Sequence, residues 1–236
     1  MKHPYKALTL LATAGLLSTS GFAETMYLRG DFNGWSTSLP LSDVGGGVYS
    51  ATVTGGTAGN AFEFKVANAD WSVGYPGGNA KSVYNLSGDF IAYYIPTPAA
   101  DGWSPAANRV GYADPGQFGW DVMGSFNSWS APVTTLAAQG NGLYTGDYTV
   151  ATPGTYDFKF RKAGDWAISI GNDFANSAGN ISLTTTTPNE LISFQLDLPD
   201  GRFQAVPVPE PSQLWYVSGG ALTALGVWIK RRRTAA

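Results

Sequence analysis

The stretch Gly30-Asp31-Phe32-Asn33-Gly34-Trp35 decides the fold, because a second version of it, Gly124-Ser125-Phe126-Asn127-Ser128-Trp129, follows 94 residues later. Three further pairs of segments match in the same order, at offsets of 94 or 95. They are Gly47-Val48-Tyr49 with Gly142-Leu143-Tyr144, Phe62-Glu63-Phe64-Lys65 with Tyr156-Asp157-Phe158-Lys159, and Asp70-Trp71 with Asp165-Trp166. Ordered matches at a nearly constant offset indicate an internal repeat. We therefore predict two copies of one module, residues 24–105 and 118–207, joined by a linker over 106–117. Four prolines lie in or next to the surrounding stretch 97–119, which predicts a semi-rigid spacer; they are Pro96, Pro98, Pro105 and Pro115.

Within each copy, the segments have the pattern of short β-strands. Residues 61–67 and 155–161 alternate aromatic with charged side chains, the period of two that is typical of a half-buried strand. Glycine and asparagine cluster at 45–47 and 140–142, where tight turns are expected. The other expected strands are 26–29, 48–53, 90–95, 121–123, 143–150 and 191–198. The pattern predicts an all-β fold, with two tandem immunoglobulin-like β-sandwiches.

The two ends of the chain have the composition of targeting segments. Residues 1–23 combine two lysines with an apolar run and the small-residue site Gly21-Phe22-Ala23, which predicts a secretory signal peptide. A short buried helix is the alternative for this segment. At the other end, the uncharged residues 214–229 precede Lys230-Arg231-Arg232-Arg233. This order predicts a transmembrane helix whose basic end lies in the cytoplasm, so that the body lies on the far side.

The tail 208–236 also carries a motif, Pro209-Glu210-Pro211, in front of its apolar segment. Motif, helix and basic cluster in this order resemble the PEP-CTERM sorting signal of Gram-negative bacteria. The resemblance implies an exosortase-type membrane enzyme as a partner that cleaves near the motif. The protein would then be exported, anchored in the membrane by its helix before processing, and afterwards located at the cell surface or outside the cell. A plain membrane anchor is the alternative.

Charge and residue types argue against several classes of function. The chain has a net charge of −3, but six of its fourteen basic residues lie at the two ends, which leaves eight basic against sixteen acidic residues over 24–209. Such a body lacks the basic footprint that nucleic acid requires. The single histidine is His3 and the chain has no cysteine, so the body has no serine triad, thiol nucleophile or usual zinc site. We expect no enzyme activity, cofactor or metal, with a paired-carboxylate glycosidase, or calcium at Asp165 and Asp173, as alternatives.

The ordered repeat motifs resemble those of early-set β-sandwiches that bind glycogen and starch. Such modules include carbohydrate-binding module family 48, the glycogen-binding domain of the AMP-activated kinase β subunit and accessory modules of pullulanases. The resemblance covers nearly all of both copies and implies that two tryptophans, a lysine and an asparagine hold the sugar. These residues are Trp129, Lys159, Trp166 and Asn180 in the second copy, and Trp35, Lys65 and Trp71 in the first, where Asn79 and Asn85 are both candidates for the asparagine.

Two functions stay open at this point. In the first, the apolar face of a pyranose lies on an indole ring while lysine or asparagine binds its hydroxyls, so that the two modules hold an α-glucan or another extracellular polysaccharide. Two sites on one chain would then add avidity. In the second, the protein is a purely structural surface protein with no defined sugar ligand, and the tryptophans are packing residues. Exposed rings that lie together would favour binding, whereas buried rings would favour the structural function.

Overall fold

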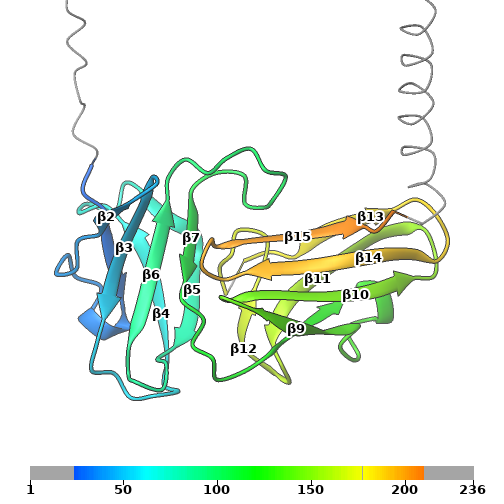
Figure 1. The fold of residues 1–236 in the computed structure, drawn as a ribbon, viewed down its shortest axis with the longest axis horizontal. Coiled ribbons are helices and arrows are strands. Elements are labelled where there is room, and N and C mark those ends of the chain that lie inside the picture. Colours follow the sequence, from blue (N-terminus) through cyan, green and yellow to red (C-terminus); the bar gives the residue numbers. More distant parts are fainter. Residues whose placement is uncertain (1–23, 177, 210–236) are drawn as a thin grey trace, which may run out of the picture.

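The computed structural model describes residues 24–176 and 178–209, which form an all-β fold with several sheets (Figure 1). The predicted signal peptide 1–23, the predicted transmembrane helix 214–229, and Glu210 and Pro211 of the sorting motif lie outside the described residues. Pro209 is described and exposed. Over the described ranges, no helix has the length and apolar character needed to cross a membrane.

The first half of the described chain contains seven strands in two antiparallel sheets. The elements are β1 (Tyr27–Gly30), the 3-10 turn η1 (Asp31–Asn33), β2 (Ser42–Gly45), β3 (Val48–Val53), β4 (Ala61–Ala67), β5 (Gly74–Val83), β6 (Phe90–Ile95) and β7 (Arg109–Tyr112). The strand order is β1-β4-β5 in one sheet and β2-β3-β6-β7 in the other. The two sheets pack face to face, since the ring centroids of Phe64 on β4 and Phe90 on β6 are 4.7 Å apart.

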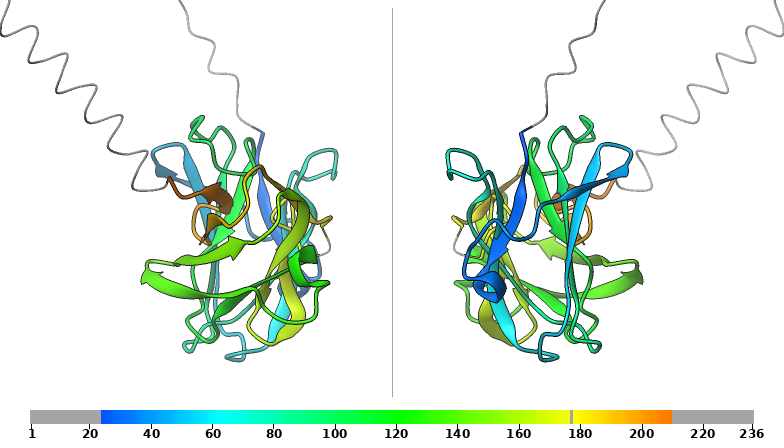
Figure 2. Two further views of the ribbon diagram at one scale, coloured as in Figure 1. Left: turned by 90° about the vertical axis from the view of Figure 1, so that its right-hand side faces the viewer. Right: turned by 90° about the vertical axis from the view of Figure 1, so that its left-hand side faces the viewer.

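The second half contains eight strands, which are joined in one sheet. Its elements are β8 (Trp120–Gly124), the 3-10 turn η2 (Ser125–Asn127), β9 (Thr134–Gly140), β10 (Leu143–Val150), β11 (Gly154–Lys162), β12 (Asp165–Ile170), β13 (Ile181–Thr185), β14 (Glu190–Asp197) and β15 (Arg202–Pro207). The strand order is β12-β11-β8-β9-β10-β14-β15, with β13 also paired to β11. The sheet is continuous because β9 pairs with both β8 and β10. The two halves are consistent with two β-sandwiches. The left view of Figure 2 has the second half of the described chain nearer the viewer, and the right view has the first half nearer.

Alternation of side chains explains why the central strands form. Along β4, Phe62, Phe64 and Val66 are buried, whereas the charged side chains between them are half-buried. The hairpin between β2 and β3 needs glycine, because residues 45–47 have φ values of 94°, 64° and 79°, in the left-handed region. The strand and the turn expected here from the sequence are thus confirmed.

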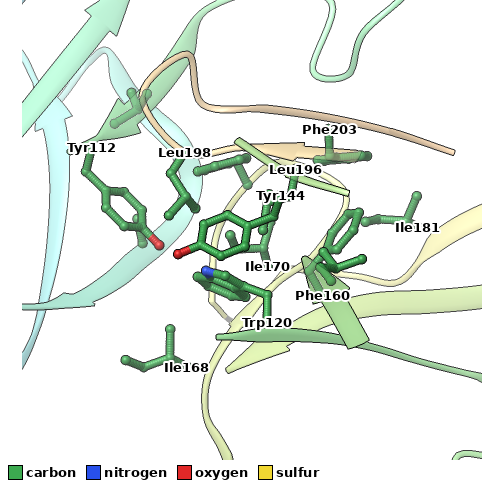
Figure 3. Close-up of a cluster of buried hydrophobic side chains, with 14 of the residues drawn as sticks. Tyr112, Trp120, Tyr144, Phe160, Ile168, Ile170, Ile181, Leu196, Leu198 and Phe203 are labelled. Atoms are coloured by element: carbon green, nitrogen blue, oxygen red, sulfur yellow. The ribbon is translucent and has the colours of Figure 1, made fainter. Parts of the chain in front are cut away.

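The prediction of a spacer over residues 106–117 needs a correction. Residues 109–112 of this range are strand β7, which is buried along its whole length and pairs with β6. Figure 3 shows Tyr112 of β7 in one cluster with Leu198, Tyr144 and Trp120 of the second half. The prolines around β7 suggested a spacer, but hydrogen bonding to β6 and burial against the second half make this segment part of the core.

Polar contacts also join the two halves. The backbone nitrogen of Tyr112 donates to the Leu198 oxygen at 2.8 Å, and Ser104 and Phe203 exchange two backbone hydrogen bonds of 2.9 and 2.7 Å. The Asp101 carboxylate accepts from Arg109 at 2.8 Å and from Arg202 at 2.9 Å, so it links β7 to β15. A continuous core and these contacts hold the two halves together as one body.

Candidate functional site

The repeated motif forms a tight turn after the first strand of each half. The position just before η1 requires glycine, because a Cβ at Gly30 would lie only 2.5 Å from the Glu63 carbonyl oxygen. The next aromatic residue, Phe32, packs its ring against the core. Trp35 follows the turn, and its backbone nitrogen donates to the Gly30 oxygen at 2.9 Å. The motif thus fixes the turn to the core and places its tryptophan at the edge of the module.

Each half brings its two predicted tryptophans into contact. The ring centroids of Trp35 and Trp71 are 6.2 Å apart, and those of Trp129 and Trp166 are 6.0 Å apart. Trp71 and Trp166, here called the outer indoles, have 45% and 46% of their surface exposed. Trp35 and Trp129, the inner indoles, are half-buried. Two similar aromatic surfaces therefore result from the two copies.

Three of these four tryptophans have unusual backbone conformations. Trp35, Trp71 and Trp129 have φ values of 63°, 66° and 61°. A bulky residue in the left-handed region is strained, and such strain clusters at ligand sites and switches. At these three positions the chain has tryptophan in a left-handed backbone conformation, which glycine would adopt with less conformational strain.

The two predicted lysines make equivalent contacts. Lys65 donates its Nζ to the Gly77 oxygen, and Lys159 donates to the Ala178 oxygen, both at 2.7 Å. Partial burial lowers the pKa of Lys65 from its usual value, while the Asp173 carboxylate of the second half opposes this shift. Each ammonium is thus held beside a strand and keeps hydrogen atoms that can reach another acceptor, since it has three donors.

Strand register identifies the counterpart of Asn180. Phe64 on β4 pairs with Ala80, and the repeat-related Phe158 on β11 pairs with Ile181. Ala80 and Ile181 are therefore equivalent, and so are the residues that precede these two, Asn79 and Asn180. The lysine contacts at Gly77 and Ala178 agree with this register. Asn79 is therefore the equivalent of Asn180.

The two asparagines nevertheless have different surroundings. Asn180 is exposed, whereas the Asn79 amide donates to Glu63 Oε2 at 2.9 Å, and its backbone oxygen accepts from Asn176 of the second half at 2.8 Å. The other candidate, Asn85, accepts from the nitrogens of Ser87 and Asp89 and closes a turn.

The two acids weighed as calcium ligands bind protein donors. Asp165 accepts from the Ala167 nitrogen at 2.8 Å and from Lys162 at 3.0 Å, and these contacts, the backbone donor foremost, lower its pKa. Asp173 accepts from the Ala175 nitrogen at 3.0 Å and from the Gly78 nitrogen at 3.1 Å. Over the described ranges, no three His, Cys, Asp or Glu residues are grouped as a metal site would need.

Two residues that the sequence motifs did not indicate also belong to these surfaces. Arg29 places its guanidinium carbon 3.8 Å from the ring centroid of Trp71, and Arg161 places its own 5.0 Å from that of Trp166. Both arginines are buried. Each half thus brings together an indole pair and a buried guanidinium, and it also carries the predicted lysine and asparagine.

Comparisons with known proteins add little to this geometry. No protein-family model and no curated protein matches the chain. Among solved structures, a pullulanase from Bacillus acidopullulyticus is similar with 13% sequence identity and a TM-score of 0.28. The similarity covers 78% of this chain and 28% of that protein. A TM-score of 0.28 is too low for any conclusion about fold or function.

Proposed function

We propose that this chain is a non-catalytic, exported surface or matrix protein that binds an α-glucan or another polysaccharide through its two modules, each an early-set, immunoglobulin-like β-sandwich. The observation that carries the proposal is the paired indoles. In each half, two tryptophans far apart in sequence lie in contact, and the outer ring has nearly half of its surface exposed. A ring that served packing alone would be buried.

The chemistry of these surfaces suits a sugar. A pyranose presents C–H groups on one face, which an exposed indole can cover, and hydroxyls at its edge, which Lys159 and Asn180 can bind. The second half is the better candidate, because its asparagine is exposed whereas Asn79 is engaged with Glu63. The absence of histidine and cysteine from residues 24–209 supports a binding role without catalysis.

Location follows from the sequence of the two ends. We propose that residues 1–23 direct export and that Pro209-Glu210-Pro211, with the apolar and basic segments after it, acts as a sorting signal for an exosortase-type enzyme. A protein placed in this way at the cell surface would meet extracellular polysaccharide. The second candidate function, a structural surface protein, is favoured by one observation, which is that the inner indoles are half-buried.

Substituting Trp166 with alanine tests the proposal. We expect roughly a tenfold to hundredfold loss of affinity for a soluble glucan such as glycogen, the range lost when an aromatic contact is truncated at a binding hot spot. Because the ring is 46% exposed, the melting temperature should change little. Affinity electrophoresis and thermal melting of residues 24–209 measure the two effects.

Trp103 provides the matched control. It is also partly exposed and lies on a guanidinium, with Arg202 4.5 Å from its ring centroid, but it belongs to neither indole pair. Trp103→Ala should leave retention by the glucan unchanged. Absence of retention of the parent protein by any glucan or exopolysaccharide tested, or unfolding of the Trp166 variant, would favour the structural function instead.

A further inference from the structure

A buried guanidinium covers one face of the outer indole in the first half. Arg29 is 6% exposed, whereas Trp71 above it is 45% exposed. At 3.8 Å from the ring centroid, the guanidinium carbon is in van der Waals contact with the indole. The exposed area of Trp71 therefore belongs to its other face and its edges. Arg161, which is 8% exposed, has the corresponding place beside Trp166.

The two arginines come from different positions of the repeat. Strand register equates Arg29 on β1 with Met123 on β8, and Ala67 on β4 with Arg161 on β11. Each copy thus has an apolar residue where the other has its arginine, and the guanidinium reaches the outer indole from a neighbouring strand. The two copies thus differ in the strand that carries the cation but agree in placing the cation beside the ring. This outcome is expected if the contact itself is needed.

Arg29 also joins the two segments that carry the indoles. Its Nε donates to the backbone oxygen of Trp35 at 2.8 Å. Its Nη1 donates to the oxygens of Asn68 and Ala69, at 2.8 and 3.2 Å, in the hairpin that leads to Trp71. One side chain therefore fixes the inner indole's backbone and the outer indole's hairpin relative to each other.

In the second half, an ion pair connects the guanidinium to the hairpin that leads to the outer indole. Arg161 donates to both oxygens of Asp121, at 2.9 and 2.6 Å. Asp121 in turn accepts from the Gly164 nitrogen at 3.2 Å, in the hairpin that leads to Trp166. The partners differ from those of Arg29, but the guanidinium is again tied to the hairpin of the indole that it contacts.

We propose that Arg29 and Arg161 are positioning residues for the outer indoles: each guanidinium holds one ring face, so that the opposite face is presented to a sugar. The inference rests on the proposed function. A ring that is already ordered loses less conformational freedom on binding, which raises affinity without any contact between arginine and sugar.

The test uses residues 24–209 with the substitution Trp166→Phe, which removes the tryptophan pair of the second half. Within the described residues, Trp35 and Trp71 are then the remaining tryptophan pair. Arg29→Met and Arg29→Lys are compared by exciton-coupled circular dichroism, which reports the geometry of the indole pair without ligand, and by affinity for glycogen. We expect Arg29→Met to remove most of the exciton couplet, which is the circular dichroism signal of the two coupled indoles. The same substitution should weaken the binding of glycogen roughly two- to thirtyfold. Arg29→Lys keeps a cation and should lie between Met and the parent.

Arg109→Met is the matched control, because Arg109 is 2% exposed and makes its hydrogen bonds at the junction of the two halves. It should lower the melting temperature and leave the couplet and the affinity unchanged. If Arg29→Met behaves in the same way, Arg29 supports the fold alone and the inference is overturned. If Arg29→Met fails to fold, an unchanged couplet and affinity in Arg29→Lys overturn it. If the chain with both tryptophan pairs intact does not bind glycogen, the proposed function fails, while the couplet still decides whether Arg29 positions the ring.

Discussion

Replacing Gly111 with alanine is expected to destabilise the whole body strongly, because a new Cβ has no space at the junction of the two halves. It would collide with the backbone oxygens of Pro199 and Leu198, which cannot turn aside as a side chain can. The 2.8 Å hydrogen bond from the Tyr112 nitrogen to the Leu198 oxygen would be lost with the same movement. Overpacking a core costs 1–3 kcal/mol, and we expect about 3 kcal/mol here because the colliding atoms are backbone. The free energy of unfolding in urea measures the effect.

Gly119→Ala is the matched control for this prediction. Gly119 lies shortly after β7, and a Cβ there would meet no heavy atom within 4 Å. An exposed substitution of this kind should change the free energy of unfolding by less than about 0.5 kcal/mol. Equal stabilities of the two variants would contradict a tightly packed junction and would restore the interpretation of residues 106–117 as a spacer.

Sequence patterns predicted strands best where side-chain alternation is strong. The expected segments 48–53, 61–67, 90–95 and 143–150 coincide with β3, β4, β6 and β10. Alternation is visible in these strands because one face of each lies on the core and the other on solvent. The internal repeat then predicted the same order of elements in both halves.

Strands that depend on their neighbours were missed. The start of β5, Tyr75-Pro76-Gly77-Gly78, has the composition of a turn, yet β5 pairs with β4 on both sides of a bulge. In the second half, residues 171–180 replace this bulge and divide the strand into β12 and β13. The short strand β7 lies among prolines and was assigned to the linker. In each case, strand pairing and burial outweigh the local composition. These two effects depend on residues far away in the sequence, so a local pattern cannot predict them.

The tryptophans and lysines of the candidate site could be located from the repeat, since both copies carry them. Arg29 and Arg161 could not, because comparison of the copies aligns each arginine with an apolar residue, Met123 or Ala67. Only the fold brings the two guanidinium groups beside equivalent rings. The counterpart of Asn180 likewise required strand register, because residues 171–180 disturb the offset between the copies.

Replacing Asp121 with alanine is expected to cost about 3–5 kcal/mol, because it leaves the guanidinium of Arg161 buried without its carboxylate. The two side chains are 3% and 10% exposed, so water can compensate little of the loss. The Gly164 nitrogen loses its acceptor as well. The double variant Asp121→Ala/Arg161→Ala, which removes both charges, should be more stable than Asp121→Ala alone. Urea unfolding of the parent, both single variants and the double variant closes this thermodynamic cycle.

The control for this cycle is an exposed ion pair. Asp200 lies 2.9 Å from Arg202 with 43% of its side chain exposed, and Arg202 keeps Asp197 and Asp101 as partners when Asp200 is removed. Asp200→Ala should therefore cost less than about 1 kcal/mol. If Asp121→Ala is as mild as Asp200→Ala, solvent reaches Arg161 and the surroundings of Trp166 are more open than the packing indicates. If the double variant is the least stable of the set, the pair stabilises the hairpin beyond the cost of burying its charges, and the support of Trp166 depends on both residues together.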